Sequence, residues 1–464
     1  MPHTHALTTS TLRGLLLLAL LSSLSACSTL QDASHLDDAA PDQPTPTVTG
    51  AQGTLSPQAT RSLLLRHWKN SFVDTQALAA LEELATSQPL IAGNQVTLLY
   101  DGPQTVAAMT RAIAGAKNHI NLETFIFDAD AVGTAMAELL MQRQRAGVQV
   151  NIIYDAVGTL STPRAFFERM RAAGIHLLAF NPVKPISALA PWKLNQRDHR
   201  KLLVVDGRVA FTGGVNISSS YANSSLFRSH DHHAGRVGWR DTHVQIDGPA
   251  VAALQWEFLN HWSNQQGEAL SDSDFFPAQQ AAGKTLVRVL ASEPQGAQEI
   301  YRAYLLAIRS AKMSVHITAA YFAPDAQMLR ALQAAARRGV EVTLVLPSVR
   351  ESSLVFYAGQ GLYRELLQSG IHLYQLQLTV LHAKTAVIDG LWSTVGSTNL
   401  DTRSFLHNHE LNVVVFDEAF GLAMESAFAE DLRLSTPLTL QEWEQRPLTE
   451  RLKEWFASRF AYWL

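Results

Sequence analysis

Apolar positions divide the chain into short strand-like runs and longer stretches with helical spacing. The segment 57–86 is helical in pattern, and the body of the chain begins there. Strand-like runs and helical patterns then follow one another, with runs at 96–100, 120–127, 148–154 and 175–180 and helical patterns at 133–145 and 163–173. The same order starts again at about residue 286. Strands that alternate with helices predict an α/β fold, with a sheet covered by helices on both faces.

Polar residues repeat at one fixed spacing along the two halves of the chain. Each residue of the first set recurs 183 positions later, as His199, Lys201, Asp206, Gly213 and Asn216 match His382, Lys384, Asp389, Gly396 and Asn399. A repeat of this kind indicates two copies of one structural unit. We therefore expect two similar α/β domains related by a pseudo-twofold axis, with the active site at their interface.

Chain length agrees with this division, because 464 residues exceed the usual size of one hydrophobic core. The expected parts are an N-terminal helical segment 57–90, domain 1 at 91–266, a polar linker 267–284, domain 2 at 285–435 and a C-terminal amphipathic segment 436–464. Hydrophobic residues make up 47% and charged residues 17%, as in an ordinary globular protein. The net charge of −4 gives no basic excess, so we expect no nucleic-acid partner.

The first 27 residues have the pattern of a secretory signal. Arg13 precedes a short leucine-rich run, and small residues lead up to Cys27, the only cysteine of the chain. A run this short does not span a bilayer, and one cysteine excludes an internal disulfide. Leu24-Ser-Ala-Cys27 resembles the bacterial lipobox, which implies a signal peptide 1–26 and lipidation of Cys27. Residues 27–56 are rich in Asp, Pro and Thr, so they are expected to form a flexible tether.

The repeated residues suit chemistry on a phosphodiester. Alternate residues of a strand point to one face, so each His is expected to project with the Lys two positions later. One neutral histidine can attack phosphorus while the other, protonated, donates to the departing alcohol. The two lysines, with Asn216 and Asn399, would bind the non-bridging oxygens. This chemistry requires no metal and no other cofactor.

The sequence around the repeated motif resembles the phospholipase D superfamily, and most closely its bacterial cardiolipin synthases. The likeness is carried by Arg197-Asp-His-Arg-Lys-Leu-Leu-Val-Val-Asp-Gly207 and by His382-Ala-Lys-Thr-Ala-Val-Ile-Asp-Gly390 with Gly396-Ser-Thr-Asn-Leu-Asp-Thr-Arg-Ser404. It runs from about residue 94 to the C-terminus. The resemblance implies transfer of a phosphatidyl group between two phosphatidylglycerol molecules through a phosphohistidine, with cardiolipin and glycerol as products.

The resemblance also implies roles for carboxylates. Glu410 in the second half and Asp241 in the first are expected to orient the histidines through their other ring nitrogen. Asp206 and Asp389 belong to the catalytic motif, but we expect them to support the site more than to touch substrate. Gly214 stands where the second half has Ser397, so the half-sites are unequal. We expect His199 to be the nucleophile and His382 the acid.

Other functions remain open at this point. Hydrolysis or headgroup exchange on other phospholipids needs the same residues with a different acceptor. A nuclease and a non-enzymatic lipoprotein scaffold are further alternatives, although the charge argues against the first and two intact motifs against the second. The expected location is a bacterial cell envelope, facing the periplasm, and Ser28 favours the outer membrane by resemblance to enterobacterial sorting. The oligomeric state is not predicted.

Three further segments have two readings each. His-rich 229–233 invites a metal site, but it lies in a polar stretch without a counterpart in the second half, so a loop near the site entrance is favoured. The C-terminal segment spaces its large apolar residues at helical intervals, which fits either a membrane interface or packing on the parent domain. The apolar loop 182–192 is lipid-facing or simply packed.

Overall fold

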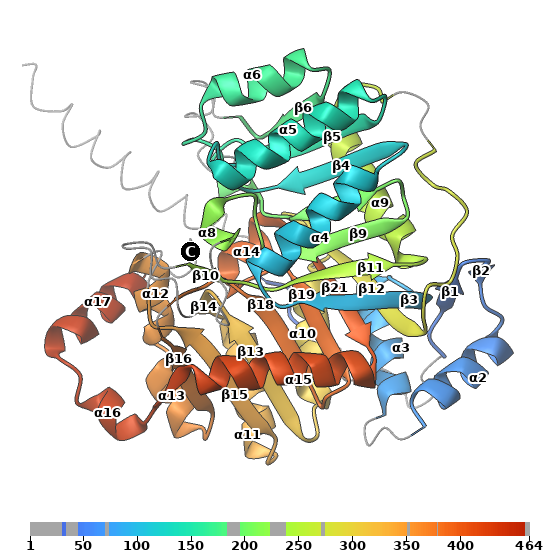
Figure 1. Cartoon of the computed structure of the whole chain (residues 1–464). Coiled ribbons are helices and arrows are strands. Elements are labelled where there is room, and N and C mark those ends of the chain that lie inside the picture. The colour runs from blue at the N-terminus through green and yellow to red at the C-terminus, as the bar shows by residue number, and fades with distance from the viewer. Residues whose placement is uncertain are drawn as a thin grey trace, which may run out of the picture.

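The computed structural model describes residues 30–33, 45–69, 74–182, 195–222, 238–270, 274–349, 353–377 and 379–459. Two α/β halves are visible in it, one above the other (Figure 1). The expected pair of similar domains, each an α/β sandwich, is therefore confirmed. The signal sequence, Cys27, Ser28, the tract 229–233 and most of the loop 182–192 lie outside the described residues.

The sheet of the first half has a mixed order. Its strands are β3 (Leu90–Leu99), β4 (His119–Thr124), β5 (Gln149–Asp155), β6 (His176–Phe180), β8 (Leu202–Val205), β9 (Val209–Gly213) and β11 (His243–Asp247). The strand order is β6-β5-β4-β8-β9-β11-β3, with β6, β5 and β4 parallel and the remaining pairs antiparallel. Parallel strands require crossover helices, which explains the βα alternation of this half.

The second half repeats this order. Its strands are β12 (Thr285–Ser292), β13 (Ser314–Ala319), β15 (Glu341–Pro347), β16 (His372–Leu376), β18 (Lys384–Ile388), β19 (Trp392–Gly396), β21 (Asn408–Phe416) and β22 (Ser435–Leu438). They follow the order β22-β16-β15-β13-β18-β19-β21-β12. The antiparallel pair β3 and β12 joins the two sheets, with Ile91 opposite Val287.

Helices cover both faces of each sheet. In the first half these are α4 (Gly102–Gly115), α5 (Ala131–Arg145), α6 (Arg164–Ala172), α8 (Ser219–Ala222) and α9 (Ala250–Asn264). The helices of the second half and its flanks are α10 (Glu299–Ser310), α11 (Ala326–Arg337), α12 (Ser353–Gln360), α13 (Tyr363–Gln368), α14 (Thr402–Leu406), α15 (Glu418–Arg433), α16 (Leu440–Glu444) and α17 (Leu448–Ser458). Of these, α16 packs on α13 and α17 packs on α12 at the outer edge of this half. Aspartates cap several helix starts, as Asp130 accepts from the amide of Gly133.

One hydrophobic core is shared by the two halves. Leu202, Val204 and Val244 of the first sheet pack in the same cluster as Val413 and Val415 of the second. Helices α9 and α15 complete this cluster, while α4, α5 and α6 cover the opposite face of the first sheet. Strand β21 is buried along its whole length, with polar residues at its start and an unbroken apolar run at 413–416. The halves therefore form one packed body.

The N-terminal region differs from the expected flexible tether. Short strands β1 (Val48–Gly50) and β2 (Gly53–Thr54) pair with each other, and β1 also pairs with β3. Val48 is fully buried, and the amide of Ala33 donates to Gln327 Oε1 at 3.0 Å. Helices α2 (Pro57–His67) and α3 (Thr75–Thr86) follow, as expected. Backbone pairing, which the polar composition does not reveal, fixes residues 48–54 on the body.

Candidate active site

Two short strand pairings connect the halves, and a motif histidine follows directly after a strand of each pairing. Strand β7 (Arg197–Asp198) is parallel to the start of β21, and β10 (Trp239–Arg240) is parallel to β17 (Val380–Leu381). The amide of His199 donates to the carbonyl of His409 at 2.9 Å, and the amide of His382 donates to that of Arg240 at 2.7 Å. Each histidine is thus held by backbone from the opposite half.

A carboxylate of the second half contacts the ring of the first histidine. His199 Nδ1 lies 3.1 Å from both Oε1 and Oε2 of Glu410, which is fully buried. Ser397 Oγ donates to Glu410 Oε2 at 2.5 Å, and Asn408 Nδ2 donates to Oε1 at 3.1 Å. These donors fix the carboxylate, which in turn fixes the imidazole and leaves Nε2 for chemistry.

The second histidine has the reciprocal arrangement. His382 Nδ1 lies 2.7 Å from Asp241 Oδ2, and the amide of Thr242 donates to Asp241 Oδ1 at 2.8 Å. A Cβ added at Gly214 would lie 2.0 Å from Asp241 Oδ1. Gly214 thus leaves the space that the Asp241 carboxylate occupies. The equivalent residue of the second half, Ser397, instead donates a hydrogen bond to Glu410.

The motif lysines lie beside their histidines but not on a common strand. His199 and Lys201 fall between β7 and β8, and His382 lies between β17 and β18. Lys201 Nζ donates to the carbonyl of His199 at 2.6 Å, and Lys384 Nζ donates to that of His382 at 2.5 Å. The expected strand alternation is therefore wrong in detail, because the chain leaves the sheet to cross to the other half.

Burial and charge give the two half-sites different protonation. Burial lowers the pKa of His199 well below its usual value, and the charges of Lys201 and Lys384 lower it further. Burial also raises the pKa of Glu410 to about 7 and lowers that of Lys201 to about 7. Burial opposes ionisation of Asp241, but the charge and the hydrogen bond of His382 outweigh it and lower the Asp241 pKa. A neutral His199 and an ionised Asp241 beside His382 follow.

The motif asparagines differ in their contacts. Asn216 Oδ1 accepts from the amide of Ile126 at 3.0 Å, and its Nδ2 donates to Tyr221 Oη at 2.8 Å. Among the described residues, the second amide proton of Asn216 has no acceptor. Asn399 is buried, and its Oδ1 has no hydrogen-bond partner among the described residues.

The motif aspartates point away from the histidines and bind backbone. Asp206 accepts from the amides of Lys117, Asn118 and His119 at 2.7–3.1 Å. Asp389 accepts from the equivalent amides of the second half, those of Lys312, Met313 and Ser314, at 2.7–2.9 Å. Both aspartates have a positive φ, 54° and 53°, where the chain turns after a strand. These contacts are structural, and they place neither carboxylate against a substrate.

Aromatic side chains flank both histidines and were not predicted from the sequence. The Phe125 ring lies 5.2 Å from that of His199, and Lys201 Nζ lies 5.3 Å from the Phe125 centroid. Trp239 lies 5.1 Å and Tyr221 5.4 Å from His382. They lie outside the repeated motif, so spacing alone does not identify them.

One cluster within the described residues has a spacing suitable for a metal ion. Glu123, Asp198 and His261 offer ligand atoms within 4.8 Å of one another, and all three are fully buried. His261 Nδ1 already lies 2.6 Å from Glu123 Oε1. Burial raises the pKa of Glu123 to about 7 and that of Asp198 well above its usual value, although the positive charge of Arg200 opposes both shifts. We interpret this cluster as a buried, hydrogen-bonded support behind His199.

The length and the polarity of the helices show whether any of them could span a membrane. Within the ranges that the structure describes, none of the helices is both long enough and apolar enough to cross a bilayer.

Two α/β halves that share one centre of paired histidines and lysines define a protein of the phospholipase D type. The family model described as "Cardiolipin synthase, PLD-like domain" matches residues 109–226 and 304–432. The chain is 34% identical over 374 residues to the cardiolipin synthase of Geobacillus kaustophilus (strain HTA426), covering 79% of this chain and 72% of that one. It is 33% identical over 366 residues to the major cardiolipin synthase ClsA of Bacillus subtilis (strain 168), with 78% and 73% covered. The chain belongs to the cardiolipin synthase family.

A solved structure agrees with this fold. The phosphatidylserine synthase of Haemophilus influenzae Rd KW20 superposes with a TM-score of 0.58 at 14% identity, covering 80% of this chain and 95% of that one. At this identity the likeness concerns the fold alone.

Proposed function

We propose that this protein is a phosphatidyltransferase that makes cardiolipin and glycerol from two molecules of phosphatidylglycerol. The observation that carries the proposal is the reciprocal pair of buried contacts, His199 with Glu410 and His382 with Asp241, at the interface of two PLD-like halves. The named activity of the relatives supports the choice of donor and acceptor.

The proposed reaction has two steps. His199 Nε2 attacks phosphorus, the bond from phosphorus to the headgroup glycerol oxygen breaks, and His382 gives its proton to that oxygen. A hydroxyl of a second phosphatidylglycerol then attacks the phosphohistidine and releases its proton to His382, and the phosphorus–nitrogen bond breaks. His199 suits the first role because its low pKa keeps it neutral. His382 suits the second because the ionised Asp241 favours its protonated form.

Positive groups offset the charge that develops on the phosphoryl oxygens. Lys201 and Lys384 are buried beside the histidines and are assigned this role together with the side-chain amide of Asn216. Asn399 is assigned the equivalent position in the second half.

The test is product analysis with labelled phosphatidylglycerol in vesicles. Wild type is expected to release glycerol and form cardiolipin, and His199→Ala is expected to form none. Phosphatidic acid without cardiolipin would instead identify a hydrolase. Phosphorus label bound to His382 rather than His199 after a rapid quench in alkaline denaturant, in which a phosphorus–nitrogen bond survives, would reverse the assigned order of the two histidines.

We also propose that the chain is a lipoprotein held at the bacterial envelope through Cys27. The support is the sequence pattern of residues 13–27, which lies outside the described residues. A lipid anchor keeps an enzyme next to an insoluble substrate, so the two proposals fit one another.

A further inference from the structure

The proposed reaction brings two phosphate groups into one site, and only one of them reacts. His199 attacks the phosphate of the donor, whereas the phosphate of the acceptor keeps its bonds and its negative charge. Three carbon atoms separate the acceptor phosphate from the attacking hydroxyl, so the two phosphates come close together and repel each other. Lys201, Lys384 and Asn216 are assigned to the reacting phosphate. A further cation near His199 is therefore needed to hold the acceptor.

Arg403 lies between the second motif and the first histidine. The second motif is followed by β20 (Leu400–Asp401) and then by α14, which contains Arg403. Asp401 accepts from the amide of Ser404 at 2.7 Å and so fixes the start of this short helix. The chain then enters β21, whose first residues pair with β7 directly before His199. Figure 1 shows α14 where the two halves meet.

The guanidinium group of Arg403 differs from those of the buried arginines. It is half-buried, and it has no hydrogen-bond or ion-pair partner within the part of the chain that the structure describes. The fully buried arginines each lie against a carboxylate, as in the pairs Arg197 with Asp155, Arg240 with Asp431 and Arg288 with Glu82. A guanidinium without such a carboxylate can bind an anion through two parallel hydrogen bonds.

The charge of Arg403 acts on the first half-site. Burial is the main cause of the low pKa of His199, the charges of the motif lysines and of His382 follow, and that of Arg403 adds to them. Burial also lowers the pKa of His407, and Arg403 again adds to the effect. Arg403 is thus close enough to His199 to influence it, although the two side chains form no hydrogen bond. This placement suits an anion that lies beside the reacting phosphate.

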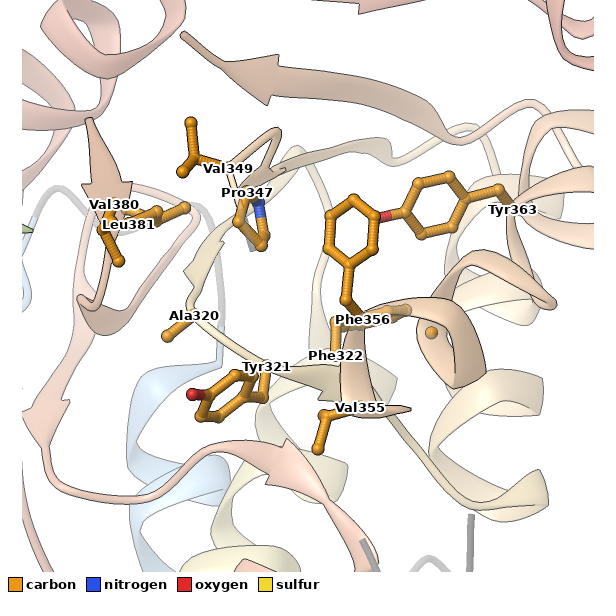
Figure 2. Close-up of a pocket in the computed structure, with 11 residues that line it drawn as sticks. Ala320, Tyr321, Phe322, Pro347, Val349, Val355, Phe356, Tyr363, Val380 and Leu381 are labelled. Carbon is orange, nitrogen blue, oxygen red and sulfur yellow. The ribbon is translucent and has the colours of Figure 1, made fainter. Parts of the chain in front are cut away.

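Two neighbouring features are less suitable for the acceptor phosphate. Arg197, two residues before His199, is 2% exposed, and its Nη1 lies 3.4 Å from Asp155 Oδ1. The apolar hollow that Val380 and Leu381 help to line (Figure 2) has a volume of about 20 Å³, which is room for one water molecule. Among the described residues, the half-buried arginine of α14 is therefore better placed for a second anion than either of them.

We propose that Arg403 binds the phosphate of the acceptor phosphatidylglycerol, the phosphate that does not react. The inference rests on the proposed phosphatidyltransferase function and names the group that selects its acceptor. A guanidinium presents two parallel N–H groups to two phosphate oxygens. The hydroxyl three carbons away is then positioned to attack the phosphohistidine at His199. Its oxygen bonds to phosphorus, the phosphorus–nitrogen bond breaks, and its proton passes to His382. Water and uncharged alcohols gain nothing from Arg403.

The test compares two soluble acceptors that differ in one phosphodiester. Glycerol and glycerophosphoglycerol, which is phosphatidylglycerol without its acyl chains, carry different isotopes and compete for the phosphohistidine formed from phosphatidylglycerol in vesicles. The ratio of the two isotopes that enter lipid does not depend on how much of the protein is folded. Wild type is expected to prefer glycerophosphoglycerol about ten- to a hundredfold, the factor for hydrogen bonds between charged groups. Arg403→Gln is expected to remove most of this preference, because only the charged acceptor loses a contact.

Further variants make the test decisive. Arg364→Gln removes a guanidinium on α13 that is 55% exposed, and it should keep the wild-type ratio. Arg403→Met also removes the charge and replaces Arg403→Gln if that variant does not fold. A wild-type ratio in either Arg403 variant, or no preference in wild type, would overturn the acceptor site. Wild type that incorporates neither isotope and makes no cardiolipin from phosphatidylglycerol would instead overturn the proposed function.

Discussion

The two half-sites differ at a single small residue that decides where a carboxylate can lie. Gly214 leaves Asp241 its place, since an added Cβ would come within 2.0 Å of Asp241 Oδ1. Gly214→Ala is therefore expected to displace the carboxylate and break its 2.7 Å contact with His382. We expect kcat with phosphatidylglycerol to fall about 100-fold, the low end of the range for loss of general acid catalysis.

A substrate with a nitrophenol leaving group separates this effect from unfolding. Nitrophenolate departs without a proton, so Gly214→Ala should retain the release step that this substrate reports. Gly115→Ala, where a Cβ meets nothing within 4 Å, is the matched control. Equal losses with both substrates would contradict a role for Gly214 in positioning the acid.

Glu410 and Lys201 make the activity depend on pH near neutrality. Glu410 must be ionised to accept the Nδ1 proton of His199, and its pKa is raised by burial to about 7, so activity should rise as pH increases through 7. Lys201 must be charged to bind phosphate, and burial lowers its pKa to about 7, so activity should fall as pH increases further. A narrow, bell-shaped profile of kcat/KM is expected.

Variants assign the two limbs of this profile. Glu410→Gln is expected to lower kcat/KM and to remove the rising limb, because the amide does not titrate. Lys201→Met should remove the falling limb. A rising limb that persists in Glu410→Gln would show that another group controls it.

At the scale of elements, the positions of strands and helices could be predicted from the sequence, whereas the contacts between the two halves could not. The expected run 148–154 is β5 at Gln149–Asp155, and the expected helix 133–145 is α5 at Ala131–Arg145. Periodicity is a local signal, and these elements obey it. The pairs β7 with β21 and β10 with β17 involve two residues from each strand, too few for any periodic pattern. That Glu410 meets His199, rather than the histidine of its own half, follows only from these pairs.

The motif aspartates stabilise secondary structure. Each lies in the turn after one strand and accepts hydrogen bonds from backbone amides at the start of another strand. Asp389 accepts three backbone hydrogen bonds at the start of β13. Asp389→Asn keeps the shape and tolerates the positive φ, but weakens charge-assisted bonds, so the free energy of unfolding should fall by about 1–3 kcal/mol. Thermal melting would show a lower Tm, with kcat per folded molecule unchanged.

Asp247→Asn is the control for this substitution. Its carboxylate, at the end of β11, accepts from the side chain of Gln245 at 2.9 Å. We expect little change in its Tm. A loss of kcat in Asp389→Asn at unchanged Tm would contradict the structural role and make the motif aspartate part of the chemistry.

At the scale of the whole molecule, one chain supplies both halves of the site. His199 and Asp241 come from the first half, and His382 and Glu410 from the second, within a shared core. A mixture of His199→Ala and His382→Ala proteins should therefore be no more active than either alone, because no molecule in it has both histidines. Restored activity on mixing would require exchange of halves between chains. Size-exclusion chromatography of the mixture would then show a dimer.

Position relative to the bilayer is the last property of the whole molecule, and the proposed lipid anchor is expected to set it. Acylation of Cys27 would contribute about 0.8 kcal/mol for each buried methylene. Cys27→Ala is therefore expected to move most of the protein from the membrane fraction to the soluble one and to abolish incorporation of labelled fatty acid.

In the Cys27→Ala variant, kcat should change less than the distribution of the protein between membrane and soluble fractions. The site lies in the body of the chain, so purified Cys27→Ala protein is expected to keep kcat with monomeric short-chain substrate and to lose turnover with vesicles at low lipid concentration. Ser28→Ala, next to the cysteine, controls for a change in this segment without loss of the acylated residue. Retention of Cys27→Ala in the membrane fraction, with no labelled fatty acid on wild type, would show that the chain is not a lipoprotein.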